Sequence, residues 1–357
     1  MGELKKERIN TITGIKILAL LAIFVWHCNV LKKPDLGARA CEILFICSGF
    51  CMAYNYYKTD FQGNIYEAIQ FVLKRIKKFY PLYIITMLIS MFYLVCYKGY
   101  ILNGALMTTG IFNILLIQSW CTGTFNGAAW FLSALMFCYF CTPFILSILR
   151  ECNRKKKIYL FIAVLFIRLA LEYIRISYPS IISFSLHSYP LVRMLEYFLA
   201  CIMGSFFIDM KEKLDEYLTI KSKNKYTILF NILEVLGLVS YISAVILFDN
   251  IWYRGLFVLI GLILISIYAF QKGIISKILS NKFFTKVSKY EMEFFLWHQV
   301  IINFLMLIGF NSWNLLIASF ILTCIVSFLY QYLYNVLKNR IKEFGHKNNL
   351  KREDSGV

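Results

Sequence analysis

The stretch LLAIFVWHCNVL, residues 20–31, places a histidine near the end of an apolar run. It belongs to a segment, about 13–31, that is long enough to cross the hydrocarbon core of a bilayer as a helix. Similar segments recur along the chain, and they predict an all-α, polytopic integral membrane protein. An imidazole inside such a segment needs an explanation, because polar groups are costly there and are commonly functional.

The composition supports the membrane class. Of the 357 residues, 59% are hydrophobic and 16% are charged, whereas a soluble domain carries about 25% charged residues. The mean hydropathy is +0.64. The N-terminal MGELKKERIN runs into the first apolar segment without a small-residue cleavage site, so no cleaved signal peptide is expected. We also expect no appended soluble domain.

The apolar segments predict about ten transmembrane helices, at about 13–31, 40–57, 80–98, 128–149, 158–176, 189–209, 227–248, 254–271, 290–309 and 314–335. Segment 101–120, ILNGALMTTGIFNILLIQSW, is apolar too. If it spanned the bilayer, the basic turn RECNRKKK would lie outside. We therefore expect it to be re-entrant or to lie on the outer surface, packed against other helices.

The net charge of +18 follows from the expected topology. With the N-terminus inside, most of the 38 Lys and Arg residues lie on the cytoplasmic face, as the positive-inside rule requires. The charge thus gives no reason to expect a nucleic-acid partner. We expect a multi-pass protein of the cell membrane with both termini cytoplasmic, divided into a transmembrane domain, 1–337, and a basic cytoplasmic tail, 338–357.

The eleven cysteines do not form a metal-binding pattern. The CxxC at Cys138 and Cys141 lies inside an apolar segment, and no second pair follows at zinc spacing. Thiols in such surroundings pack as small hydrophobic groups. No metal site is expected.

The first two segments place a histidine and a carboxylate near the same surface. Lys16 precedes His27 by eleven residues, about three helical turns, so the lysine lies near the inner surface and the histidine near the outer one. Glu42 begins the returning segment, and the small residues from Ser48 to Phe50 permit close approach of a helix or a ligand. A neutral histidine oriented by a carboxylate has the features of a general base. We predict His27 and Glu42 as catalytic residues.

Other ionisable residues lie within the later segments, and two readings stay open for them. They are either paired charges that fix helix packing or parts of a functional site. For His298, the alternatives are packing against a neighbouring helix and contact with substrate. The residues concerned are Arg168, Glu172, Arg175, Arg193, Glu196, Glu234, Glu291, Glu293 and His298.

A basic cluster stands in FVLKRIKKFYPLYI, just before Pro81, a residue that can start a helix. Such a cluster at a cytoplasmic helix entrance is either a topology signal or a binding site for a phosphate-rich donor. Its members are Lys74, Arg75, Lys77 and Lys78.

These motifs occur in the order in which they occur in the acyltransferase 3 family of integral-membrane acyltransferases, which the chain resembles over about 8–335. Lys16 and His27 match the family's basic residue, ten intervening residues and histidine, although the family more often has Arg. Glu42 and the following FICSGF are similar to the family's acid and FF-x-x-SGF. The stretch KYEMEFFLWHQ, which contains His298, resembles a late histidine motif of the family.

The middle of the chain resembles the family as well. The family element RR-x-x-R-x-x-P looks like the run from Lys74 to Pro81, with Lys at two of the three basic positions. Trp130 and Leu132 match the family's W-x-L. Many members carry a Glu five residues after the Trp, where this chain has Leu135. Branches that lack this Glu resemble sugar and polysaccharide O-acetyltransferases.

The resemblance implies transfer of an acyl group, usually acetyl, from cytoplasmic acyl-CoA to a hydroxyl of a cell-envelope polysaccharide or lipid-linked sugar. Acyl-CoA would be a donor substrate, with no permanently bound cofactor. We predict that Lys16, Arg75 and Lys78 bind the donor. The residues predicted to bind substrate are Ser48, Trp130, Arg193 and His298.

Two other functions remain open on the sequence. A polysaccharide or lipid-linked-sugar transporter would also have many spans and intramembrane charges. The sequence shows no internal repeat and no matching pair of broken helices, which such transporters commonly have. A membrane-embedded sensor or interaction protein is the third reading. Acyl transfer by the purified protein separates the enzyme from both.

Overall fold

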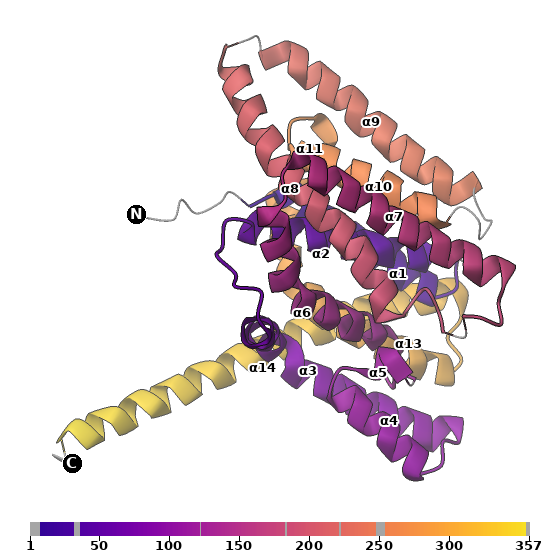
Figure 1. Cartoon of the computed structure of the whole chain (residues 1–357). Helices are drawn as coiled ribbons and strands as arrows, with labels where there is room; N and C mark the ends of the chain where they lie inside the picture. Colours follow the sequence, from indigo (N-terminus) through magenta and orange to yellow (C-terminus); the bar gives the residue numbers. More distant parts are fainter. Residues whose placement is uncertain are drawn as a thin grey trace.

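The computed structural model describes residues 8–31, 36–121, 123–182, 184–220, 223–247 and 254–354, and within these ranges the chain is helical with connecting turns (Figure 1). The helices are α1 (Asn10–His27), α2 (Leu36–Tyr56), α3 (Ile65–Lys98), α4 (Gly104–Ile114), α5 (Gln118–Cys121), α6 (Trp130–Glu151), α7 (Arg154–Ser177), α8 (Pro190–Ile220), α9 (Lys223–Leu247), α10 (Arg254–Ala269), α11 (Ile274–Leu279), α12 (Lys282–Val287), α13 (Glu291–Leu307) and α14 (Ser312–Asp354), with 3-10 turns at Gly127–Ala129 and Ser288–Tyr290.

Each of the ten expected spans coincides with a helix, but not all of these helices are long and apolar enough to cross a membrane. Among the described residues, seven helices meet both criteria, or up to eight spans do when a bent pair of helices is counted as one span. The seven are α1, α2, α3, α6, α8, α9 and α14. That pair runs from Gly255 to Leu307 and bends by 78°. The chain is thus an all-helical membrane protein, and the expected number of ten spans is not confirmed.

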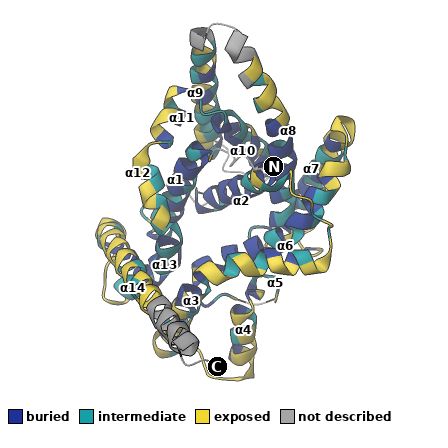
Figure 2. Cartoon of the chain, turned by 90° about the vertical axis from the view of Figure 1, so that its left-hand side faces the viewer, coloured by how far each residue is buried: buried dark blue, intermediate teal, exposed yellow. Residues whose placement is uncertain are grey.

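Helix α2 lies at the centre of the bundle, and 78% of its most apolar stretch is buried, against 22% for α14. Figure 2 shows this difference as buried residues along α2 and exposed ones along α14. Small residues allow α2 and α8 to pack closely. A Cβ added to Gly204 would lie 2.8 Å from the carbonyl oxygen of Phe50, so this contact requires glycine.

Helix α3 begins earlier than expected. The side chain of Asn64 accepts a hydrogen bond from the amide of Glu67 and caps the helix, which then continues through Pro81 to Lys98. Pro81 therefore lies within the helix and does not start it. The basic cluster before it is helical, so Lys74, Arg75 and Lys78 share one face while Lys77 lies outside that face.

Segment 101–120 forms two short helices, α4 and α5, in place of a span. At 11 residues α4 is too short to cross a bilayer. It lies beside α3 (Figure 1), and its C-terminal end is held there because the hydroxyls of Tyr80 and Tyr83 donate to the carbonyls of Ile114 and Asn113. This agrees with a segment that turns back on itself.

The long helix α14 continues without a break through the boundary expected at 337–338. Lys338, the first residue of the expected tail, lines the same cavity as Lys16 near the start of α1. The last three residues of the tail, 355–357, lie outside the described residues. The start of α1 and this part of α14 thus lie at the same end of the bundle.

Candidate active site

A basic cavity of about 650 Å³ opens between α1, α3, α6, α13 and α14. It contains the three residues predicted to bind the donor, Lys16 from α1 and Arg75 and Lys78 from α3. Six basic side chains and two acidic ones line it, so its surface favours anions. The charged lining residues are Lys16, Lys74, Arg75, Lys78, Lys289, Lys338, Glu291 and Glu293.

Much of the remaining lining is apolar, and α6 contributes the largest share of it. Leu135, at the position where many acyltransferase 3 members carry a Glu, belongs to this wall. The cavity thus combines charged groups suited to phosphate with a surface suited to an uncharged chain. Its apolar lining includes Leu20, Leu44, Phe131, Leu132, Leu135, Met136 and Phe295.

Arg75 is held rigidly at the cavity wall. One guanidinium nitrogen donates to the carbonyl of Phe71 at 2.9 Å, and the guanidinium carbon lies 3.3 Å from the centre of the Phe71 ring. The rings of Tyr56 and Tyr139 lie 5.3 and 5.1 Å from it. These contacts orient the planar group while it still lines the cavity.

Ser48 also lines the cavity, and its hydroxyl donates to the carbonyl of Leu44 at 2.7 Å. The hydroxyl oxygen therefore remains available as an acceptor. Ser48 thus lies with the three predicted donor-binding residues, although the sequence placed it with the acceptor-binding ones.

His27 lies at the end of α1 on the helix face that Lys16 and Leu20 present to the cavity, about 16 Å further along the axis. Its imidazole is half-buried and contacts two aromatic rings. The ring centroids of His27 and His298 are 5.3 Å apart, and those of His27 and Trp26 are 4.8 Å apart. The structure thus pairs the predicted base with a second histidine, on α13.

The structure does not bring His27 and Glu42 together. Within the described part of the chain no hydrogen bond or ion pair joins them. Glu42 instead accepts a hydrogen bond from Arg39 at 2.6 Å and lies 3.7 Å from Arg193. The predicted contact between His27 and Glu42 is therefore wrong, because the Glu42 carboxylate pairs with two arginines instead.

Glu42 belongs to a buried network of three arginines and three glutamates that connects α2, α7 and α8. Arg193 binds Glu196 at 2.5 Å, and Arg168 binds Glu196 at 3.0 Å and Glu172 at 2.7 Å. The attraction between each carboxylate and its guanidinium partner offsets part of the free-energy cost of burying the two charges. The packing interpretation of Arg168 and Glu172 thus has structural support.

The remaining ionisable residues have separate roles. Arg175 lies outside the network and donates to the carbonyl of Pro179 at 3.3 Å. Glu234 accepts hydrogen bonds from the amides of Gly273 and Ser276 and from the Ser276 hydroxyl. It therefore binds the N-terminus of α11, where a carboxylate is favoured by the helix dipole.

Trp130 and Arg193, both predicted to bind substrate, meet through His187, a residue that the sequence analysis did not select. The Trp130 and His187 ring centroids are 4.5 Å apart. Arg193 donates to the His187 carbonyl at 2.6 Å and lies 3.2 Å from its ring nitrogen Nδ1. His187 lies in a connecting turn, and its local sequence pattern does not identify it as a functional residue.

Three phenylalanines connect the cavity with the histidine pair and with the ion network. Phe295 lines the cavity, and its ring centroid lies 5.8 Å from that of His298 and 5.5 Å from that of Phe131. Phe131 in turn lies 4.6 Å from Phe45, whose ring faces Arg193. A continuous row of packed aromatic rings therefore connects the basic cavity, the histidine pair and the ion network.

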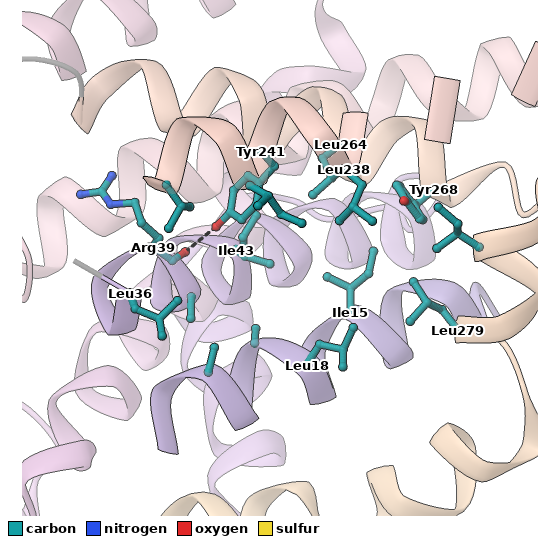
Figure 3. A pocket seen from close by; sticks show the side chains of 16 residues that line it. Ile15, Leu18, Leu36, Arg39, Ile43, Leu238, Tyr241, Leu264, Tyr268 and Leu279 are labelled. Atoms are coloured by element: carbon teal, nitrogen blue, oxygen red, sulfur yellow. Dashed lines mark hydrogen bonds between the residues drawn. The ribbon is translucent and has the colours of Figure 1, made fainter. Parts of the chain in front are cut away.

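A second cavity of about 250 Å³ lies between α1, α2, α9, α10 and α11 (Figure 3). Its lining is almost entirely aliphatic. The hydroxyl of Tyr241 donates to the backbone carbonyl of Arg39 at 3.3 Å, and the Arg39 guanidinium binds Glu42. The polar groups in its lining are already bonded within the protein, since the Tyr268 hydroxyl donates to the carbonyl of Glu234. We therefore place the site at the basic cavity.

Comparison with known proteins identifies the family. The acyltransferase domain model of the acyltransferase 3 family matches residues 9–332, almost the whole chain. The chain belongs to this family. The resemblance seen in its motifs is thus confirmed.

Two curated relatives of this chain match over part of their length. It is 26% identical over 163 residues to acyltransferase MdmB from Streptomyces mycarofaciens, which is 40% of this chain and 41% of that protein. It is 29% identical over 98 residues to protein 2 in the picA locus of Rhizobium radiobacter, which is 27% of this chain and 51% of that protein. The chain thus spans about two fifths and one half of these relatives. No solved structure matches it.

Proposed function

We propose that this acyltransferase moves an acyl group, in particular acetyl, from cytoplasmic acyl-CoA to a hydroxyl of a cell-envelope carbohydrate. The observation that carries the proposal is the basic cavity, where Lys16, Arg75 and Lys78 converge with three further basic side chains. The adenosine phosphates of CoA match such a surface, and its uncharged arm matches the apolar wall.

His27 is the proposed general base. It removes the proton of the acceptor hydroxyl, and the hydroxyl oxygen forms the new ester bond to the thioester carbonyl carbon. The C–S bond breaks, and the leaving thiolate takes up the proton from His27, so CoA leaves as a free thiol. General-base assistance of this kind typically contributes about 10²–10⁴-fold to the rate.

The acceptor is proposed from the chemistry of the outer end of the site. Trp130 and His187 are partly exposed and offer ring surfaces on which a sugar can stack, and Arg193 holds His187 in place. The location in the cell membrane, with both termini cytoplasmic, is part of the same proposal. It places the basic cavity toward cytoplasmic CoA and His27 toward the envelope.

The test uses the purified full chain in proteoliposomes with acetyl-CoA labelled in the acetyl group. We expect labelled ester on an added envelope polysaccharide and an equal amount of free CoA thiol. Mass spectrometry of envelope polysaccharides from a deletion strain, which should lack one acyl substituent, names the acceptor. Transport of the carbohydrate without consumption of acetyl-CoA would refute the proposal and favour the transporter.

A further inference from the structure

His298 is enclosed more completely than any other histidine whose side chain the structure describes. It is fully buried on α13. The rings of Phe24, Phe294 and Phe295 lie around it, with centroids 6.3, 6.3 and 5.8 Å from its own. A ring packed on these sides has little freedom to turn, so its nitrogen atoms point in defined directions.

The hydrogen bonding of His298 fixes its tautomer. Nδ1 lies 2.7 Å from the carbonyl oxygen of Phe295. A carbonyl oxygen only accepts hydrogen bonds, so Nδ1 carries the hydrogen, and in the neutral ring Nε2 is then a bare acceptor. Among the described residues Nε2 has no hydrogen-bond partner. A buried acceptor without a donor lowers the stability of the fold. An unpaired nitrogen at this position therefore indicates a functional role.

His27 supplies the nearest donor-bearing ring. The three phenylalanine rings around His298 carry no donor, whereas the His27 imidazole lies 5.3 Å away between centroids, tilted by 50°. A hydrogen bond between the two rings requires the partly exposed His27 ring to turn until one of its N–H groups faces Nε2 of His298. The neutral His298 ring cannot donate to His27, because its one N–H hydrogen already bonds to the carbonyl of Phe295.

We infer that His298 is a positioning residue, which accepts a hydrogen bond from His27 at Nε2 and thereby fixes the tautomer and orientation of the catalytic imidazole. This inference rests on the proposed role of His27 as the base. With one nitrogen of His27 donating to His298, the other is unprotonated and faces the acceptor hydroxyl. The chain from the Phe295 carbonyl through both imidazoles thus performs the task that the sequence assigned to Glu42.

The test compares two substitutions of His298 that differ in one property. His298→Phe retains a ring of similar size in the aromatic cluster but has no acceptor. His298→Gln places an acceptor oxygen near the position of Nε2. We expect His298→Phe to lower kcat by about 10- to 100-fold with an unchanged KM for acyl-CoA, and His298→Gln to recover much of this loss. Equal loss in both folded variants, or full kcat in His298→Phe, would overturn the inference.

A second measurement does not depend on the folding of the variants. The chain has four histidines, so ¹⁵N-histidine spectra of the wild-type protein in detergent can be assigned by single substitutions. We expect His298 in the neutral form with the proton on Nδ1, and His27 in one dominant tautomer. A mixture of both tautomers at His27, or a proton on Nε2 of His298, would contradict the inference.

The two proposals fail in different ways. If His27→Ala transfers acyl groups at the wild-type rate, the proposed base is wrong, whatever tautomer His298 adopts. If His27→Ala is inactive while His298→Phe is fully active, the base stands and the positioning role of His298 is refuted.

Discussion

The imidazole rings of His27 and His298 lie 5.3 Å apart between centroids, although one ends the first helix and the other lies on α13. The contact joins the two ends of the chain at the proposed reaction centre. Phe295, one turn before His298 on α13, lines the basic cavity. A single helix therefore contacts both the proposed donor site and the partner of the proposed base.

Replacing His27 by Ala should nearly abolish acyl transfer while leaving donor binding intact. The loss should reach about 10²–10⁴-fold, because general-base assistance disappears. Donor binding should persist, because Lys16, the basic residue of the cavity on the same helix, lies about 16 Å from His27 along the axis. Transfer rates measured beside the affinity for a non-hydrolysable acyl-CoA analogue check both parts. A folded His27→Ala protein with normal transfer would end this mechanism.

Lys78 and Lys77 provide a matched pair for the donor site. Both are exposed lysines on α3, but Lys78 lines the basic cavity and Lys77 does not. A charge-assisted contact to phosphate is worth about 1.5–3 kcal/mol, so Lys78→Ala should weaken acyl-CoA binding about 10- to 100-fold. Lys77→Ala should change it little. Equal effects in binding assays at several salt concentrations would indicate general charge attraction and no specific site.

The ion network should stabilise the fold. Arg168→Ala leaves the buried carboxylates of Glu172 and Glu196 without this partner, which should lower the free energy of unfolding by about 3–5 kcal/mol. Lys58 forms an exposed pair with Glu212, with side chains 69% and 66% exposed, and Lys58→Ala should cost about 1 kcal/mol or less. Denaturation of both variants in detergent measures the difference, and comparable losses would argue against the network.

The proposed orientation can be tested at two exposed positions. Lys156 begins α7 on the expected cytoplasmic side, and Asn311 lies in the turn between α13 and α14 on the expected outer side. Cysteines placed there, in a chain whose exposed cysteines are replaced by Ser, should react with a membrane-impermeant reagent from opposite sides of sealed vesicles. Reaction of both from one side would refute the topology.

The sequence predicted the class of fold and singled out three basic residues that the structure brings to one cavity. Apolar segments of spanning length locate helices well, because every backbone polar group must be satisfied within the segment. The convergence of Lys16, Arg75 and Lys78 was predictable, because the expected topology assigned all three to the same side of the membrane. Lys338 was assigned to the tail because a basic residue near the end of a chain gives no sign that its helix lines a cavity.

The sequence did not predict the outer half of the site. Glu42 was expected beside His27 because the two are close in depth, but the rotation of α2 about its axis decides which neighbour it meets. That rotation brings Glu42 to Arg39 and Arg193. The pairing of His27 with His298 depends on how α1 and α13 pack, and one sequence carries no periodic signal for contacts between distant helices.

The ion network also bears on how the protein enters the membrane. Helix α7 carries Arg168, Glu172 and Arg175 and is not among the helices apolar enough to span. Inserted alone, each such charge near the helix centre would cost about 2.5–3.5 kcal/mol at the translocon. Glu172 on the same helix pairs with Arg168, but Glu196, the second carboxylate that binds it, and Arg193 arrive only with α8. Helices α7 and α8 should therefore partition into lipid as one hairpin, after α2, so that the order of synthesis matches the order of charge neutralisation.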